Sequence, residues 1–200
     1  EVKITTKIFD EKSFTQIQKD MDEFDRKRDD VIKKSRDVVK LSKQLINSVH
    51  RDEIHKAEKL KDEIKKALAD VVEFTKGWPA LYYSGSIKVA EQEYVEALAY
   101  LEFVKNKRIL EYKDANVYME NYLLGLCDLT GELVRRAINK AINEQYSESV
   151  EIRDVVAMIY ENLMQFDFRN GELRRKFDSI KYDLKKLEDL VLELKLKDKI

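Results

Sequence analysis

The sequence has few of the residues that interrupt helices or form covalent cross-links. Its 200 residues include one proline and five glycines, far fewer than a turn-rich sandwich or barrel needs, so long helices are favoured. The single cysteine, Cys127, excludes an internal disulfide and a cysteine-ligated zinc cluster, as is typical of a reducing compartment. No apolar run approaches the roughly 18 residues of a membrane span, and no signal peptide opens the chain, so we expect a cytoplasmic protein.

An excess of charge of one sign is also missing. The chain has 38 basic and 39 acidic side chains and a net charge of −1, so bulk charge does not indicate a nucleic-acid partner, which would need basic residues gathered on one face. Charged residues form 38% of the chain and hydrophobic residues 44%. A sizeable core therefore coexists with a heavily charged surface, which excludes general disorder.

The distribution of helix breakers predicts an all-α fold in a single domain over residues 1–200. The strongest breaker cluster covers residues 76–79 and is followed closely by residues 84–86. Before it, residues 12–74 are predicted to form one very long helix or two helices in line. After it we expect four more helices, over residues 86–110, 117–144, 148–166 and 171–197.

The predicted first helix has an apolar side and a basic side. At about 100° per residue, the apolar side comprises Val38, Val39, Leu41, Ser42, Leu45, Ile46 and Val49, and the opposite side comprises Arg36, Lys40, Lys43, Asn47 and His50. A solvated face explains the basic side, and so does a surface facing RNA or DNA, because phosphates favour Lys and Arg in a row. The last predicted helix has apolar residues at steps of three and four, which indicates core or a subunit contact: Phe177, Ile180, Leu184, Leu187, Val191 and Leu194.

An apolar stretch from 121 to 134 contains only two charged residues, Asp128 and Glu132. They lie four apart and share a helix face, where like charges repel by a few tenths of a kcal/mol. Gly125 and Gly131 in the same helix each cost about 1 kcal/mol relative to alanine. That cost predicts that another backbone or a ligand comes close there.

A second acidic pair, Glu93 and Glu96, lies three residues apart on the preceding predicted helix. Two helices that each present two inward carboxylates form divalent-metal sites in helical bundles, and oxygen-only ligands suit Mg²⁺ or Mn²⁺ better than zinc. The alternative is that Glu132 pairs with Arg136 while Glu93 and Glu96 are exposed. A di-iron centre is disfavoured, because neither histidine forms a Glu-x-x-His motif.

Other catalytic motifs are missing. The sequence has no glycine-rich phosphate loop, no GxSxG, and no histidine that accompanies a nucleophilic Ser or Cys. Cys127 is expected to be a buried small hydrophobe. Trp78, Tyr82 and Tyr83 could stack on bases, but packing in the core or between subunits is the favoured interpretation.

Four segments resemble the translin family, and in particular its translin-associated factor X branch. They are YLLGLCDLTGELVRRAIN at 122–139, QEYVEALAY at 92–100, SRDVVKLSKQLINSVHR at 35–51, and the C-terminal FDFRNGELRRKFDSIKYDLKKLEDLVLELK. The length and the rich Lys and Glu usage are similar to those of a compact archaeal relative. The resemblance implies a bundle of about six to seven helices, with a very long first helix, that assembles into a closed, hollow, octamer-like homo-oligomer.

The resemblance also implies a Mg²⁺-dependent endoribonuclease that cleaves single-stranded RNA, with Mn²⁺ as a substitute and a translin-like subunit as a further partner. The family's Glu-x-x-Glu pair falls on Glu93 and Glu96, and the two acids of its DLTGEL motif fall on Asp128 and Glu132. Glu93, Glu96 and Asp128 are expected to ligate the metal, and Glu132 to be a ligand or an outer base.

The residues expected to hold the RNA backbone are basic: Arg36, Lys40, Lys43, Arg135 and Arg136. The alternative function is a non-catalytic RNA- or DNA-binding oligomer like translin, and a structural scaffold is a third. The complete set of four acids favours the enzyme.

Overall fold

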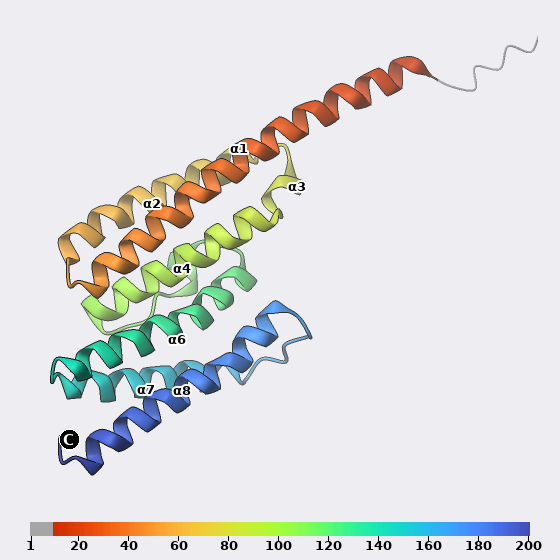
Figure 1. The fold of residues 1–200 in the computed structure, drawn as a ribbon. Coiled ribbons are helices and arrows are strands. Elements are labelled where there is room, and N and C mark those ends of the chain that lie inside the picture. Colours follow the sequence, from red (N-terminus) through yellow and green to blue (C-terminus); the bar gives the residue numbers. More distant parts are fainter. Residues whose placement is uncertain (1–9) are drawn as a thin grey trace, which may run out of the picture.

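The computed structural model describes residues 10–200, which form helices and no strand within that range (Figure 1). Two helices are single turns, α3 (Pro79–Tyr82) and α5 (Tyr112–Ala115). Six are long: α1 (Glu11–His50), α2 (Ile54–Phe74), α4 (Gly85–Asn106), α6 (Met119–Ile142), α7 (Tyr146–Leu163) and α8 (Glu172–Leu196). The all-α prediction with a very long first helix is confirmed. The predicted single domain also included residues 1–9, which lie outside the described residues.

The prediction of one helix, or two in line, over residues 12–74 is wrong. The chain reverses at residues 51–53, and α2 packs back along α1 (Figure 1). No Gly or Pro marks this turn. Asp52 adopts the left-handed conformation there, with φ 56°, and its carboxylate is bonded by Arg136 and Lys140 of α6. The turn therefore depends on partners more than 80 residues away in the sequence.

The long helices lie side by side in the order α1, α4, α6 and α8, with α2 against α1 and α7 against α8 (Figure 1). α4 is the central helix, and the residues from Ala90 to Phe103 are buried except Glu93. The apolar sides predicted for the first and last helices are buried or half-buried in this core, which confirms those two patterns.

α4 and α6 run parallel, because contacts between them advance together along both helices. Lys88 contacts Glu120 near the start of both helices, and Gln92 contacts Asp128 further along both. The helices approach closely at Gly125, where an added Cβ would lie 2.7 Å from the backbone oxygen of Gln92. The close approach predicted at Gly125 is confirmed. At Gly131 no other backbone comes close, since that residue is exposed and nothing lies within 4 Å of its Cβ position.

None of the described helices is long and apolar enough to cross a membrane.

Candidate functional site

Three of the four predicted acids line one pocket at the junction of α1, α4 and α6. Glu93, Glu96 and Glu132 share this pocket of about 420 Å³ with Lys43, Ile46, Asn47 and Arg135. Asp128 is not among the lining residues, but its negative charge acts on both Glu93 and Glu96. The parallel packing of α4 on α6 therefore brings the two acidic pairs together, as their spacing on two helices suggested.

Glu96 is the most buried of the four acids. It is 9% exposed, and its carboxyl group has no hydrogen bond or ion pair with any other residue from 10 to 200. Burial, followed by the negative charges of Asp128, Glu93 and Glu132, raises the pKa of Glu96 to about 8. At neutral pH this carboxyl group is therefore mostly protonated unless a cation enters the pocket.

Asp128 is held by a lysine that sequence reasoning missed. Nζ of Lys176, on α8, lies 2.6 and 2.7 Å from the two carboxylate oxygens, and the side-chain amide of Gln92 donates a further bond. Nothing in the local sequence pairs Lys176 with Asp128, because the two residues are brought together only by the packing of α8 on α6.

Glu132 is held by a histidine. Nε2 of His50 bonds its carboxylate, and Nη1 of Arg135 lies 3.7 Å away. The bond from His50 is the main cause that lowers the pKa of Glu132. The prediction that His50 lies on the solvated basic side of the first helix is wrong: only 5% of its side chain is exposed. His50 ends α1, and its ring turns toward α4 and α6 rather than toward solvent.

Glu93 is half-buried, and its carboxylate lies 3.5 Å from Nζ of Lys43 on α1. Burial raises the pKa of Glu93, and the charge of Lys43 partly opposes that rise. Among residues 10–200, no cluster of three or more His, Cys, Asp or Glu side chains is arranged to hold a metal ion. The donor chemistry still fits a hard divalent cation, because the pocket is lined by carboxylates and Glu96 has no partner.

Four of the five basic residues predicted to hold RNA are exposed. Arg36 and Lys40 have no ion pair within the described part of the chain, whereas Lys43 pairs with Glu93. Arg135 is exposed beside Glu132 at the pocket.

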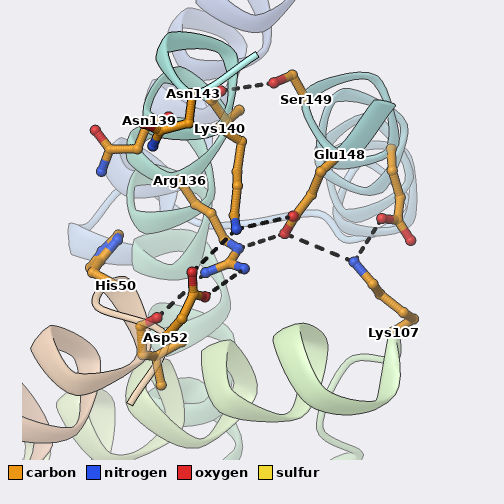
Figure 2. A network of polar contacts seen from close by, with 12 residues as sticks. His50, Asp52, Lys107, Arg136, Asn139, Lys140, Asn143, Glu148 and Ser149 are labelled. Carbon is orange, nitrogen blue, oxygen red and sulfur yellow. Dashed lines mark hydrogen bonds and ion pairs between the residues drawn. The ribbon is translucent and has the colours of Figure 1, made fainter. Parts of the chain in front are cut away.

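The prediction that the fifth residue, Arg136, holds RNA is wrong. It is 5% exposed and bonds Glu148, Asp52 and the backbone oxygen of Val49 (Figure 2). A guanidinium enclosed in this way is not available to a phosphate. The alternative interpretation that Arg136 pairs with Glu132 is wrong for the same reason.

Of the remaining candidates from the sequence, Cys127, Trp78 and Tyr82 have contacts within the fold. Cys127 is buried, and burial raises the pKa of its thiol to about 12, so the expected small hydrophobe is confirmed. Trp78 packs against Phe24 at a ring distance of 5.7 Å. Tyr82 donates to Glu91, while Tyr83 remains exposed.

The Translin family model matches residues 26–198. The chain belongs to the translin family.

Among the similar proteins, an uncharacterized protein of Methanocaldococcus jannaschii is 33% identical over 132 residues, which is 62% of this chain and 59% of that protein. Translin of Gallus gallus is 32% identical over 79 residues, covering 40% of this chain and 34% of translin. Translin-associated protein X of Mus musculus is 23% identical over 170 residues, covering 68% and 58%. The matched segments thus cover between about a third and about three fifths of the length of each of these relatives.

Two solved structures share the translin-family fold over nearly their whole length. The chain of apo-NeC3PO has a TM-score of 0.83 and 27% identity, covering 90% of this chain and 95% of that one. The chain of AfC3PO in its complex with duplex RNA has a TM-score of 0.85 and 24% identity, covering 92% and 97%.

Proposed function

We propose that this translin-family protein is a metal-dependent endoribonuclease that cleaves single-stranded RNA as part of a closed oligomer. The observation that carries the proposal is Glu96, a buried carboxyl group without a partner among three further carboxylates. Such a group is costly to bury unless a cation enters beside it. A perturbed acid in a cleft is also a mark of a functional site rather than of a packing position.

Glu93, Glu96 and Asp128 would hold Mg²⁺ or Mn²⁺, with Glu132 as a further ligand or an outer base. The bound ion would supply Lewis acidity at the scissile phosphate and lower the pKa of an attacking water. The bond from His50 lowers the pKa of Glu132 and so keeps its carboxylate ionised, as a metal ligand must be. Asp128 would have to release Lys176 before it could ligate a metal.

The RNA strand would run along α1. Lys43 lines the pocket, and Lys40 and Arg36 precede it by three and seven residues, so the three lie on one face over about two helical turns. Arg135 adds a positive charge on the other side of the pocket. AfC3PO has been solved with duplex RNA, so the cleavage test compares single-stranded with duplex substrate.

We further propose that the chain is similar in role to translin-associated protein X, since all four acids are present, and that it forms an octamer-like homo-oligomer. A translin-like partner subunit is the alternative assembly. The mass of the purified particle distinguishes them: copies of this 23.7 kDa chain alone give multiples of that mass.

The decisive experiment is cleavage of end-labelled RNA in Mg²⁺, in Mn²⁺ and in EDTA. Asp128→Asn and Glu96→Gln should each abolish cleavage while the far-ultraviolet circular dichroism stays unchanged. Asp189→Asn is the matched control, because Asp189 is exposed on α8 and has no ion pair in the described residues. Wild-type cleavage rates for Asp128→Asn in Mg²⁺ would overturn the proposal.

The product ends test the mechanism, because the site also contains a histidine. Water attack on phosphorus leaves a 5′-phosphate and a 3′-hydroxyl, and this is the expected result. Attack by the RNA's own 2′-hydroxyl, assisted by a histidine, leaves a 2′,3′-cyclic phosphate without metal. Cyclic ends formed in EDTA would make His50 the catalytic group instead.

The second candidate function is an RNA- or DNA-binding oligomer without catalysis. It is favoured by the internal partners that two of the acids already have, the ammonium group of Lys176 at Asp128 and the bond from His50 at Glu132. Salt-sensitive RNA affinity without cleavage in either metal would support it.

A further inference from the structure

His50 is enclosed at the point where three helices meet. It is the last residue of α1, its ring lies 4.9 Å from the ring of Tyr100 on α4, and its Nε2 bonds Glu132 on α6. Its other nitrogen, Nδ1, lies 3.0 Å from the hydroxyl oxygen of Tyr100. Both ring nitrogens are therefore occupied, and the ring has one orientation.

The partners of the His50 ring determine which of its nitrogens holds the proton. The carboxylate of Glu132 can only accept, so Nε2 of His50 donates to it. Tyr100 keeps its own proton because burial raises its pKa. Its hydroxyl can therefore donate to Nδ1, which leaves the ring proton on Nε2. The direction of donation thus runs from Tyr100 through His50 to Glu132.

The end of α1 beside this series is held by Arg136. Its guanidinium donates to Glu148 of α7, to Asp52 in the turn after α1, and to the backbone oxygen of Val49 (Figure 2). Glu148 in turn pairs with Lys140 and Lys107. These bonds fix the backbone on both sides of His50.

We infer that His50 is a positioning residue, oriented by Tyr100, whose Nε2–H holds the carboxylate of Glu132 in place for the metal pocket. This inference rests on the proposed function, because it assigns Glu132 a task in that pocket. It also explains why the end of α1 is bound to α4 and α6 by a polar series rather than by apolar packing alone. Partners behind a metal ligand fix its orientation and contribute to metal affinity.

The proton position can be measured without metal or RNA. The chain has two histidines, so protein labelled with ¹⁵N only in histidine gives two pairs of ring signals in solid-state spectra, which do not depend on particle size. His55→Ala assigns them. In the wild type we expect a proton on Nε2 of His50 and none on Nδ1. We expect Tyr100→Phe to change how the ring proton is distributed between the two nitrogens. A proton on Nδ1, or a Tyr100→Phe spectrum identical to that of the wild type, would overturn the inference.

Metal affinity measures the consequence for Glu132. Calorimetric titration with Mn²⁺ should show His50→Ala binding about 10- to 100-fold more weakly than the wild type. His50→Gln should recover most of that loss, because its amide N–H can replace the donor to Glu132. His55→Ala is the matched control and should bind as the wild type does, since the side chain of His55 is exposed and makes no hydrogen bond or ion pair with residues 10–200.

The outcomes separate the two proposals. His50→Ala that folds and binds Mn²⁺ with wild-type affinity would overturn the positioning role. If His50→Ala does not fold, His50→Gln and Tyr100→Phe decide the question through the same titration. A wild-type protein that binds no Mn²⁺ and cleaves no RNA would overturn the proposed function, while the proton position of His50 would still be decided by the ¹⁵N spectra.

Discussion

At the scale of single residues, the surroundings of Glu132 and Glu96 shift their pKa values in opposite directions. Glu132 has a lowered pKa because His50 bonds its carboxylate, whereas burial and three negative neighbours raise the pKa of Glu96 to about 8. Environments that separate two acids in this way commonly assign them different tasks. Here Glu132 is ionised, whereas Glu96 holds a proton until a cation replaces it.

The raised pKa of Glu96 predicts how stability depends on pH without metal. Between about pH 4.5 and pH 8 the native state keeps this proton while the unfolded chain releases it, so the free energy of unfolding falls as pH rises through that range. Glu96→Gln removes the effect. We expect its Tm to exceed that of the wild type by several degrees at pH 8 and to match it near pH 5, since about 1 kcal/mol shifts Tm by about 2–4 °C at this size.

Differential scanning calorimetry at the two pH values tests this expectation. Glu188→Gln is the control, because Glu188 is exposed on α8 and unpaired within the described residues, so its Tm difference from the wild type should be small at both pH values. Added Mn²⁺ should stabilise the wild type but not Glu96→Gln. Equal Tm differences at pH 5 and pH 8 would contradict the burial argument.

The sequence alone predicts part of this site. The spacing of Glu93 with Glu96 and of Asp128 with Glu132 placed each pair on one helix face, and the structure brings both pairs to one region. The partners His50 and Lys176 could not be predicted, because they reach the acids from α1 and α8 through packing that no local pattern encodes. The prediction that Arg136 contacts RNA was wrong for a similar reason, because its partners Asp52 and Glu148 lie on other elements.

At the scale of helices, the contact between α4 and α6 depends on Gly125. An added Cβ there would meet the backbone oxygen of Gln92 and the side chain of Val95 at 2.7 Å, so Gly125→Ala should force the helices apart. We expect a loss of about 1–3 kcal/mol in the free energy of unfolding, as for other overpacked sites. Urea unfolding measures it, and weakened Mn²⁺ binding should accompany it, because both acidic pairs lie on these helices.

Gly131 provides a matched comparison within the same helix. It is exposed, and nothing lies within 4 Å of its Cβ position. Gly131→Ala should therefore stabilise the protein by up to about 1 kcal/mol through helix propensity alone. If both substitutions changed the free energy of unfolding in the same direction, close packing would not explain why residue 125 is a glycine.

Helix α8 supplies the cation that pairs with Asp128. Lys176→Met removes that ammonium, so Asp128 is free to bind a metal and Mn²⁺ affinity should rise about five-fold, which corresponds to an ion pair of about 1 kcal/mol. Without metal the variant should be less stable than the wild type above neutral pH, because one positive charge near Glu96 is lost. Lys185→Met, on an exposed position of α8, should change neither quantity.

The sequence predicted the elements better than their connections. Scarce Gly and Pro and the 3.6-residue periodicity gave the long helices, and the breaker cluster at residues 76–79 lies where α2 gives way to α3. The reversal after His50 was missed because it uses Asp52 in a left-handed conformation and no Gly or Pro. The bonds that stabilise this turn come from α6, and the periodicity of α1 and α2 cannot predict them.

At the scale of the whole molecule, RNA affinity should depend on the exposed side of α1. Arg36→Gln with Lys40→Gln should weaken RNA binding and lower the slope of log affinity against log salt by about 1.4, the value for two phosphate contacts with a single strand. Lys43 is left intact, because it pairs with Glu93 in the pocket. Fluorescence anisotropy over a salt series measures both quantities.

The control for that variant is Lys65→Gln with Lys66→Gln, which removes the same charge from exposed positions on α2. Unfolding of both double variants should differ little from that of the wild type, since surface changes usually stay within about 0.5 kcal/mol each. An equal loss of affinity in the two double variants would indicate that RNA responds to net charge rather than to the side of α1.

The length of α1 has a consequence for local opening of the native state. Side chains from residue 12 to residue 23 are all exposed, whereas Val31, Val38, Leu45 and Val49 are fully buried. A helix of about a dozen residues in water is marginal without packing, so amide hydrogens in the first turns should exchange with deuterium much faster than those from residue 31 onward. Mass spectrometry should therefore show two ranges of exchange rate within one continuous helix. If exchange slows only in the first half of α1 when the particle assembles, that half is the segment that another subunit covers.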